Sequence, residues 1–514
     1  MLRFVRFKSH AVSCSEFQLK CGVEIHTQLN TNAKLFSLSS NNSFNSKPNK
    51  FISYFDIALP GTQPILNNEA LLYALKLSKA LNSSVNLNSS FDRKHYFYGD
   101  QPLGYQITQH FQPIAKGGYL KIFPRDGVKD ELTVEIEQLQ IEQDTGKSVY
   151  FEEEISSSGT STKGSLTLSK IDLNRANLPL IEMVTKPNFT DANQVKIFIK
   201  KFQNLVRYLN ICTGDLETGA MRIDVNVSVN GNSRVELKNL STTSSVINAI
   251  KFEYKRQVQL IKDNKESEIV QETRGWDGKR TNSLRNKETS LDYKYFPDPE
   301  LPKIHLDSKI MDQLSIGILP DEMLTKLINR PYQLSLKDAT ILTNDLSLLD
   351  YYLKLFELSI NSPNNQNTKL PGNFVIHELL GNFAKLNLKF DSNLISVSKL
   401  NELLELINTN KITQSSAKLL LQHLFNNQDD INKNLFELVE EFDLIKQDDN
   451  NNQNNSKEIE TICEEIISQN PKTVKNLNSK PNGLKFLIGQ AMRLTQGKIN
   501  ALDFENQFKK LLNL

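Results

Sequence analysis

MRIDVNVSV, residues 221–229, alternates strictly between apolar and polar side chains. Because successive side chains of a β-strand point to opposite faces, this pattern predicts a strand with one apolar and one polar face. The polar face carries a guanidinium, a carboxylate, an amide and a hydroxyl, from Arg222, Asp224, Asn226 and Ser228. Such a row is typical of a polar cavity floor that handles a charged ligand. It is equally compatible with an ordinary amphipathic strand that has a wet outer face.

Several other segments repeat this alternation. Residues 23–29 place Glu24, His26 and Gln28 on one face. Residues 134–147 place four polar side chains on one face: Gln138, Gln140, Glu142 and Asp144. Two further polar rows are formed by Lys170, Asp172 and Asn174, and by Arg234, Glu236 and Lys238. The recurrence favours strands whose polar rows share one site.

Composition limits the fold class and the partners. A chain of 514 residues with 39% hydrophobic residues is long enough for two or three domains with sizeable cores. No apolar run approaches the roughly 18 residues that a membrane span needs. The net charge of +2 provides no global field for nucleic acid, so any RNA contact must come from local patches. The four cysteines form no CxxC pair, which suits a reducing compartment and argues against structural zinc.

Both ends of the chain are basic. Residues 1–15 contain Arg3, Arg6 and Lys8 and no acid, which resembles a short mitochondrial presequence; a frayed basic terminus is the alternative. Residues 471–514 contain eight lysines and arginines against two acids. This local excess indicates either an RNA-facing patch or a solvated helical surface.

Changes in pattern divide the chain into segments. Residues 16–302 carry the alternating strands. Helical spacing within this segment predicts helices at 69–81, 191–209 and 246–262. Residues 303–446 are helical in pattern, the polar run QDDNNNQNNSK at 447–457 is interpreted as a linker, and residues 458–514 are helical again. The expected fold class is α+β, with the strands first and the helices after.

Acids on the predicted strand faces suggest a metal site. They are Glu24, Glu142, Asp144, Asp172 and Asp224, with Glu182 after a turn and His26 as the one imidazole. Carboxylates in a small cavity raise one another's pKa unless a cation neutralises them. Mg²⁺ accepts carboxylates and leaves positions for phosphate oxygens, and an imidazole also suits Mn²⁺. Arg222 and Lys147 would neutralise a transferring phosphoryl group. The alternative is a set of surface carboxylates that never meet.

An aromatic and basic cluster precedes these acids. The segment FDRKHYFYGD, residues 91–100, contains Arg93, Tyr96 and Tyr98. Aromatic rings beside arginine or lysine stack a base and hold phosphates, or they fasten a loop onto a core. Both interpretations remain open on the residues alone.

Several catalytic motifs are excluded. The segment DTGKS at 144–148 ends like a P-loop, but the first glycine of that motif would fall on Ile141. The chain has no GxSxG nucleophile elbow, and no cysteine stands in a local signature of a nucleophile. If glutamine is hydrolysed in the reaction, another chain must do it.

Long strings of the sequence resemble one protein family. They are CGVEIHTQLNTNAKLFS (21–37), FDRKHYFYGDQPLGYQITQ (91–109), IEQDTGKS (141–148), IDLNRANLPLIEMV (171–184), LETGAMRIDVNVSV (216–229), VELKNLST (235–242), QETRGWD (271–277), LDYKYFPDPELP (291–302), LPGNFVIHELLGNF (370–383) and GLKFLIGQAMRLTQGK (483–498). Together they are similar to the B subunits of aspartyl/glutamyl-tRNA amidotransferases, and the basic N-terminus is similar to that of mitochondrial members.

The resemblance implies a fold and a set of site residues. Members have a mainly antiparallel cradle domain related to glutamine synthetase, then a helical domain and a YqeY-like tail that reaches tRNA. Their metal and phosphorylation site falls here on Glu24, His26, Glu142, Glu182 and Asp224. With it we expect catalytic roles for Glu142, Asp224, Arg222 and Lys147, and substrate or ATP contacts from Arg93, Tyr96, Tyr98, Asp172, Asn174 and Lys238. In the tail, Lys485, Arg493 and Lys498 are expected to face tRNA.

The implied reaction has two stages. ATP phosphorylates the γ-carboxylate of glutamate misacylated onto tRNA(Gln), and ammonia then displaces the phosphate to give Gln-tRNA(Gln). A glutaminase A subunit of the amidase type releases the ammonia, which travels through a tunnel, and a small third subunit completes the complex. The implied setting is protein synthesis in the mitochondrial matrix.

The sequence departs from the family pattern at three places. Gln143 stands where most members have a glutamate that is thought to line the ammonia passage, and Leu103 stands where lysine is common near that passage. A neutral amide can hydrogen-bond ammonia but cannot take a proton from ammonium. Members with a zinc knuckle have cysteines at the positions of Ser37, Ser39, Ser53 and Asp56. We therefore expect no zinc here.

Two other functions compete with this one. The first is an RNA-binding assembly protein without an active site, whose acids form structural ion pairs; an acidic cluster that binds no manganese would favour it. The second is a free-standing metal phosphotransferase, which a stable lone chain with ATPase activity would favour.

Overall fold

The computed structural model describes residues 17–42, 46–155, 164–286, 293–362, 367–446, 452–471, 474, 482–495 and 501–512. The chain forms two compact units that divide between Leu319 and Pro320. The expected presequence at 1–15, residues 447–451 of the expected linker, and Lys498 lie outside the described residues.

A large sheet forms the first unit. In spatial order its strands are β15 (Thr281–Asn286), β14 (Glu272–Trp276), β13 (Val235–Lys238), β12 (Met221–Val229), β1 (Leu19–Gln28), β11 (Pro179–Thr185), β8 (Leu132–Gln143), β6 (Ala115–Lys116) and β2 (Ser84–Val85), with β7 (Tyr119–Ile122) also paired to β8. Only β13 and β14 run parallel among these pairs of described strands. The strand predicted at 221–229 and the mainly antiparallel sheet are therefore confirmed.

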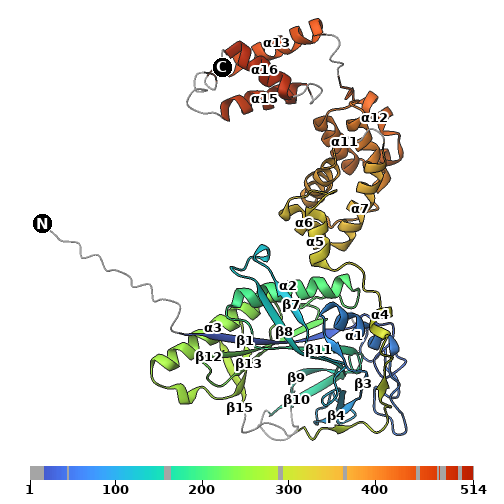
Figure 1. The fold of residues 1–514 in the computed structure, drawn as a ribbon, viewed down its shortest axis with the longest axis vertical. Coiled ribbons are helices and arrows are strands. Elements are labelled where there is room, and N and C mark those ends of the chain that lie inside the picture. Colours follow the sequence, from blue (N-terminus) through green and yellow to red (C-terminus); the bar gives the residue numbers. More distant parts are fainter. Residues whose placement is uncertain are drawn as a thin grey trace, which may run out of the picture. The chain divides into compact units, whose positions relative to one another are not determined.

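Two long helices cover one face of this sheet. Figure 1 shows α2 (Ala192–Tyr208) and α3 (Thr243–Lys262) along the same side. The apolar row of β12, with Ile223, Val225 and Val227, is buried in the core on this side. Helix α3 begins three residues before the predicted start, because the side chain of Thr242 caps it by accepting a hydrogen bond from the backbone of Ser245. The helices predicted at 69–81 (α1, Asn68–Ala80) and 191–209 are confirmed.

Shorter strands lie on the opposite side of the sheet (Figure 1). They are β4 (Asp92–His95), β5 (Tyr105–Thr108) and β16 (Phe296–Pro297) in one sheet, the hairpin of β9 (Lys147–Ile155) and β10 (Gly164–Asp172), and the pair β3 (Asn88–Ser89) and β17 (Ile304–His305). Three short helices complete the unit: η1 (Pro124–Asp126), η2 (Glu266–Glu268) and α4 (Ile310–Gln313). The polar rows of the large sheet therefore face the side with these short strands.

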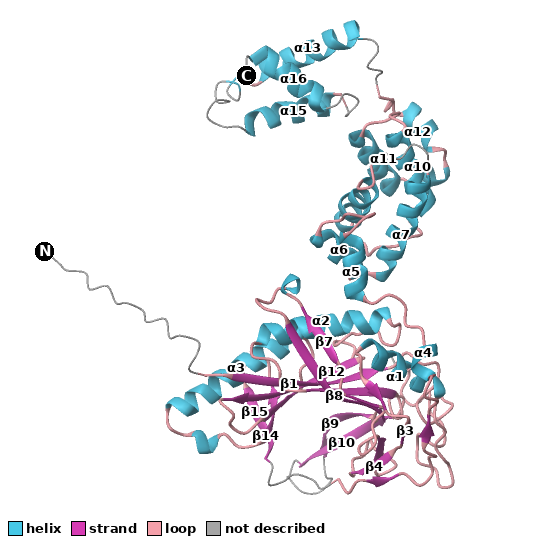
Figure 2. Cartoon of the chain, viewed as in Figure 1, coloured by secondary structure: helices cyan, strands magenta, loops and turns pink. Residues whose placement is uncertain are grey.

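The described residues of the second unit form helices and no strands (Figure 2). The helices are α5 (Pro320–Ile328), α6 (Leu336–Thr343), α7 (Leu346–Asn361), α8 (Leu370–Asn373), η4 (Phe374–Leu379), α9 (Leu380–Lys385), α10 (Val397–Asn408), α11 (Gln414–Asn426), η5 (Gln428–Asn432), α12 (Leu435–Glu441), α13 (Asn452–Gln469), α15 (Asn482–Leu494) and α16 (Ala501–Leu512). The helical pattern predicted after residue 302 is thus confirmed from Pro320 onward for these residues. It is wrong for Ile304 and His305, which pair with β3 as a strand, and residues 303–319 belong to the first unit.

The expected linker differs from the structure in its second half. Helix α13 begins at Asn452, so residues 452–457 are helical rather than irregular. The polar run contains neither proline nor glycine, and α13 is held further along by Cys463 and Ile466 in a core with α15 and α16. A helix anchored by such an apolar stripe extends into polar sequence that has no breaker.

Candidate active site

The register of four neighbouring strands brings the predicted ligands together. Glu24 of β1 lies opposite Asp224 of β12, and His26 of β1 lies opposite Glu182 of β11. On β8, Gln140 is opposite Glu182, so Glu142 lies two residues along on the same face. Side chains directly opposite each other in antiparallel strands have Cβ atoms only about 5 Å apart. Antiparallel pairing of β12, β1, β11 and β8 therefore gathers all five side chains, here called the acidic cluster.

His26 lies at the centre of the acidic cluster. Its Nε2 is 3.6 Å from Glu24 Oε1, 3.4 Å from Glu142 Oε1 and 3.8 Å from Glu182 Oε2. Ligand atoms of Glu24, His26 and Asp224 lie within 4.8 Å of one another, and so do those of His26, Glu142 and Glu182. These two overlapping groups share the imidazole and form one site.

Burial changes the protonation of the acidic cluster. Burial raises the pKa of Glu24 to about 7, and the charge of Asp224 contributes to this rise. The pKa values of Glu142 and Glu182 also lie above the ordinary range, chiefly because both carboxyls are buried. Burial, together with the charge of Arg222, lowers the pKa of His26 to about 3, so its imidazole is neutral at physiological pH. A neutral imidazole among crowded carboxylates is a donor set that fits a divalent cation.

Neighbouring side chains orient the cluster. Thr108 Oγ1 donates to Glu142 Oε2 at 3.2 Å, and Gln140 Nε2 donates to Glu182 Oε2. Lys94 of β4 faces the cluster from the other side. Burial acts to lower the pKa of Lys94, but the negative charge of Glu142 raises it above its ordinary value. The sequence patterns did not single out Lys94 and Thr108 as site residues, although alternation along β4 places Lys94 on the opposite face from Arg93 and would have pointed to it.

Asp144 pairs with two arginines and belongs to neither group of potential metal ligands. Arg222 is 2.9 Å from Asp144 Oδ1, and Arg175 Nε is 3.7 Å from Asp144 Oδ2. Arg175 is also anchored to the backbone, because its guanidinium donates to the carbonyl oxygen of Gly146 at 2.6 Å. Arg222 therefore lies beside the cluster with its charge balanced by Asp144.

The polar row that contains Asp172 and Asn174 supports a loop. The backbone N–H of Asn49 donates to Asp172 Oδ1 at 2.9 Å, and that of Phe51 donates to Asn174 Oδ1 at 2.8 Å. Lys147, which was expected with Arg222 to neutralise a phosphoryl group, is exposed at the start of β9, opposite Asp172. In this structure Asp172 and Asn174 thus hold residues 46–57, and neither belongs to the acidic cluster.

The aromatic and basic segment forms a packed wall. Arg93 pairs with Asp298 at 2.7 Å and lies 4.2 Å from the ring centroid of Tyr105. The rings of Tyr96 and Tyr98 lie 5.7 Å apart. This arrangement combines the two interpretations, because Arg93 fastens the wall while Tyr98 remains 58% exposed.

The two residues of the expected ammonia passage are both shielded. Gln143 is buried, its Nε2 donates to the carbonyl oxygen of Tyr105 at 3.4 Å, and its Oε1 has no hydrogen-bond partner among the described residues. Leu103 is half-buried against the core of the first unit. The pair contributes an unpaired amide oxygen and an apolar side chain, and no charge.

The positions that carry cysteines in zinc-binding relatives converge on one carboxylate. Asp56 Oδ2 accepts hydrogen bonds from Ser39 Oγ at 2.9 Å, from Ser37 Oγ at 3.4 Å and from the backbone N–H of Ser53 at 2.8 Å. Lys34 Nζ, fully buried, lies 3.1 Å from the same oxygen. Hydrogen bonds and one ion pair therefore hold this segment together.

The basic tail is partly described. Arg493 is exposed at the end of α15; the side chain of Lys485 lies outside the described part of the chain, as does Lys498 entirely. Among the described residues, no helix has the length and apolarity needed to cross a membrane.

Comparisons with known proteins identify the family of the chain. Residues 19–312 match the family described as the GatB/GatE catalytic domain, and residues 354–512 match the GatB domain. The B subunit of the mitochondrial glutamyl-tRNA(Gln) amidotransferase of Lachancea thermotolerans is 51% identical over 97% of this chain and 94% of its own length. Proteins of the same name from Vanderwaltozyma polyspora and Saccharomyces cerevisiae are 49% and 48% identical, over 97% and 100% of this chain and 96% and 100% of their own lengths. The chain therefore belongs to the GatB family.

Proposed function

We propose that the chain is the B subunit of a mitochondrial glutamyl-tRNA(Gln) amidotransferase, a carbon–nitrogen ligase that uses glutamine as amide donor. It phosphorylates the γ-carboxylate of glutamate on tRNA(Gln) with ATP and then amidates it. The observation that carries the proposal is the convergence of four carboxylates on the neutral imidazole of His26. The names of the relatives support glutamyl-tRNA(Gln) as the substrate and the mitochondrion as the compartment. Within the mitochondrion we place the protein in the matrix.

The acidic cluster would hold Mg²⁺ or Mn²⁺ through Glu24, His26, Glu142, Glu182 and Asp224. A cation bound there supplies charge neutralisation for the phosphates of ATP. Three side-chain cations stand around the cluster, and they are Lys94, Arg222 and Lys238. Such cations orient the transferring phosphoryl group and stabilise the negative charge that develops on it. Lys147 at the start of β9 would add a further positive charge.

The first step converts a poor leaving group into a good one. A carboxylate oxygen attacks the γ-phosphorus of ATP, the bond to the bridging oxygen breaks, and ADP leaves. The product is an acyl phosphate, which water would hydrolyse unless it is excluded. Burial of Glu142 and the half-buried ring of Tyr96 support such exclusion.

The second step needs uncharged ammonia. The ammonia nitrogen attacks the acyl carbon, phosphate leaves with the bonding electrons, and the nitrogen loses one proton to give the amide. Gln143 and Leu103 would line the route by which ammonia arrives, and neither side chain adds a charge. We infer that a glutaminase A subunit of the amidase type releases the ammonia and that a small third subunit completes the complex.

The decisive experiment separates phosphorylation from ammonia release. Asp224→Ala and Glu142→Ala should each lower ADP formation with Glu-tRNA(Gln) by about 100-fold or more, because a ligand of the charged centre is lost. Glutaminase activity of the partner protein in the same complex should remain. Glu137→Gln, at an exposed acid on the same strand as Glu142, is the matched control and should leave both activities intact. Loss of both activities in the Asp224 and Glu142 variants would instead indicate an assembly role.

Two finer features belong to this proposal. The large, mainly antiparallel sheet with helices on one face supports a cradle domain related to glutamine synthetase, which we extend from residue 302 to Leu319, where the first compact unit ends. A helical domain would follow from Pro320 to residue 446, and a tRNA-facing tail at 458–514. The protein would hold no zinc, which is supported by the donors that already surround Asp56. Metal analysis of the purified chain tests the zinc prediction directly.

A further inference from the structure

Lys238 lies between two carboxylates on the polar face of the large sheet. Its Nζ is 2.8 Å from Asp224 Oδ2 and 3.1 Å from Glu236 Oε1. Asp224 belongs to the acidic cluster, whereas Glu236 stands on β13, one strand farther from His26. The lysine therefore marks the border of the cluster, with one acid inside it and one outside.

Glu236 is held independently of Lys238. Its second oxygen, Oε2, accepts a hydrogen bond of 2.8 Å from Thr273 Oγ1 on β14. Because side chains alternate along a strand, the neighbours of Thr273, Glu272 and Arg274, point to the opposite face of the sheet. The position of the Thr273 hydroxyl, and with it the contact to Glu236, therefore depends on how firmly β14 is held.

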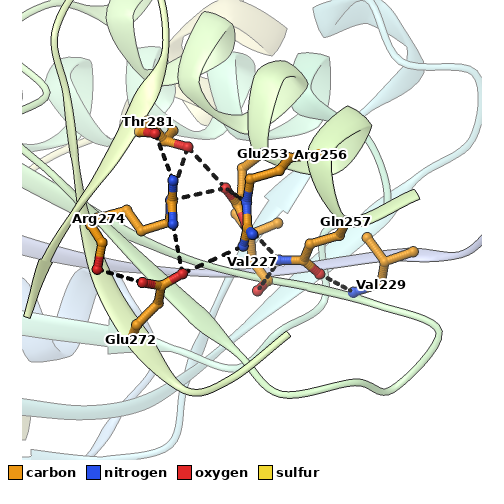
Figure 3. Close-up of polar contacts among 9 residues, drawn as sticks. Val227, Val229, Glu253, Arg256, Gln257, Glu272, Arg274 and Thr281 are labelled. Carbon is orange, nitrogen blue, oxygen red and sulfur yellow. Dashed lines mark hydrogen bonds and ion pairs between the residues drawn. The ribbon is translucent and has the colours of Figure 1, made fainter. Parts of the chain in front are cut away.

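Buried polar contacts hold β14 in place (Figure 3). Arg274 donates to Glu272 at 2.7 Å and lies 3.7 Å from Glu253, a fully buried acid of α3. One turn along α3, Gln257 Nε2 donates to Glu253, and Gln257 Oε1 accepts from the backbone of β12. The network joins α3, β12 and β14, so it sets the position from which Thr273 reaches Glu236.

An ammonium group and a divalent cation compete for the same carboxylate. Asp224 offers an oxygen within 4.8 Å of the ligand atoms of Glu24 and His26, and the same carboxylate already contacts Lys238. Two cations at such short range repel each other, so a metal bound by Asp224 weakens its contact with Lys238. Glu236 gives the ammonium of Lys238 a second partner. When the ammonium leaves Asp224, it therefore still has a counter-charge and is not buried unpaired.

We propose that Lys238 is a displaceable counter-ion of the metal site. Its ammonium neutralises Asp224 while the metal is absent, and it leaves Asp224 and keeps only its contact with Glu236 when the metal binds. This inference rests on the metal site of the proposed function. On Glu236 the ammonium stays beside the cluster, where it can contact a phosphate oxygen.

Metal affinity is the first test. Calorimetric titration of the full-length chain with Mn²⁺ should show about five- to tenfold tighter binding in Lys238→Met than in the wild type, since a competing charge is removed. Glu236→Gln should bind Mn²⁺ more weakly, because the lysine is then left with Asp224 alone. Lys186→Met, which removes a surface lysine paired with Glu135, is the control and should bind as the wild type does. Equal or weaker binding in Lys238→Met overturns the proposal.

A second measurement uses the wild-type chain and does not depend on how a variant folds. Lys238 should react slowly with an acetylating reagent while it contacts both carboxylates, and faster once Mn²⁺ has displaced it from Asp224. Mass spectrometry of the Lys238 peptide, normalised to the Lys186 peptide, measures the change. Unchanged or slower labelling in the presence of Mn²⁺ would contradict displacement. That holds even if the variants change Mn²⁺ affinity as expected, because charge repulsion without any movement of Lys238 could cause that change.

Failure of this inference is distinguishable from failure of the proposed function. If the wild-type chain binds no Mn²⁺, the metal site itself is wrong. If the wild type binds Mn²⁺ and Lys238→Met binds it no more tightly, only the counter-ion role is wrong.

Discussion

His26 shows how a single side chain is adapted to its surroundings. Burial and the charges of Arg222 and Lys238 lower its pKa to about 3, so the ring keeps a free electron pair across the physiological range. A proton donor or acceptor would need a pKa near the working pH. The imidazole is therefore suited to binding a cation and unsuited to moving protons.

A substitution at His26 tests this assignment. His26→Asn should weaken Mn²⁺ binding by about tenfold or more, because the central ligand of both groups is replaced by a weaker donor. Calorimetric titration measures the change. His305→Asn, at an exposed histidine of the same unit, should have no effect. Unchanged affinity in His26→Asn would remove His26 from the ligand set.

The three described cysteines should resist alkylation. Burial raises the pKa of Cys21 and Cys463 to about 12 and that of Cys212 to about 11, so almost no thiolate is present at pH 8. Iodoacetamide should label these thiols only after unfolding in urea, as peptide mass spectrometry can measure. The pKa values of these thiols are higher in the folded chain than in the unfolded chain. Their contribution to the free energy of unfolding is therefore fully present below about pH 8.5 and is lost as the pH rises through about 11 to 12. Rapid labelling of the native chain would contradict this account.

At the scale of elements, residues 46–57 form a loop held by one buried ion pair. Lys34 and Asp56 are both fully buried and 3.1 Å apart, and Asn177 Nδ2 donates to the second oxygen of Asp56 at 2.8 Å. Asp172 and Asn174 at the end of β10 bind the backbone of the same loop. Polar contacts therefore join the segment after β1, this loop and the residues at and just after the end of β10.

Breaking this ion pair should be costly. Asp56→Asn should lower the free energy of unfolding of the first unit by about 3–5 kcal/mol, because it leaves the Lys34 ammonium buried without a counter-charge. Urea unfolding measures the loss. Lys34→Met combined with Asp56→Asn should be less destabilising than Asp56→Asn alone, since no buried charge then remains. Lys121→Met, at an exposed pair with Glu131, is the control and should change stability by less than about 1 kcal/mol.

At the scale of the whole molecule, the chain separates two tasks. The acidic cluster lies entirely within the unit that ends at Leu319, and the basic tail belongs to the unit that begins at Pro320. The tail has its own core, with Phe504 and Phe508 packed against Cys463 and Leu487. Chemistry and RNA contact are therefore expected to respond to mutation independently.

Charge reversal in the tail tests this independence. Lys485→Glu with Arg493→Glu should weaken tRNA binding and reduce its dependence on salt, because each lost phosphate contact lowers the slope of log K against log salt by about 0.7 to 0.9. Filter binding at several salt concentrations measures both effects, and Mn²⁺ affinity should not change. Lys354→Glu, at an exposed lysine that pairs with Asp350 outside the tail, is the control and should bind tRNA as the wild type does. An unchanged salt slope in the double variant would exclude these two residues from the RNA contact.

Much of the fold was predictable because local patterns report local structure. The alternation at 221–229 gave β12 to the residue, and the apolar spacing at 191–209 gave α2 within one residue at each end. The start of α3 was wrong by three residues, since the hydroxyl of Thr242 caps it earlier than the apolar stripe suggests. The start of α13 was wrong because anchoring by Cys463 and Ile466 overrides a polar composition.

The sequence by itself determined which side chains share a strand face, where most helices lie, and which family the chain belongs to. Only the tertiary structure decided which of these faces meet. It places Glu24, Glu142, Glu182 and Asp224 around His26. Asp144 instead pairs with Arg222, and Asp172 accepts a hydrogen bond from the backbone of a loop. Alternation repeats every two residues and carries no information about strand order or register. Those are set by packing between segments that are far apart along the chain, such as β1 and β12.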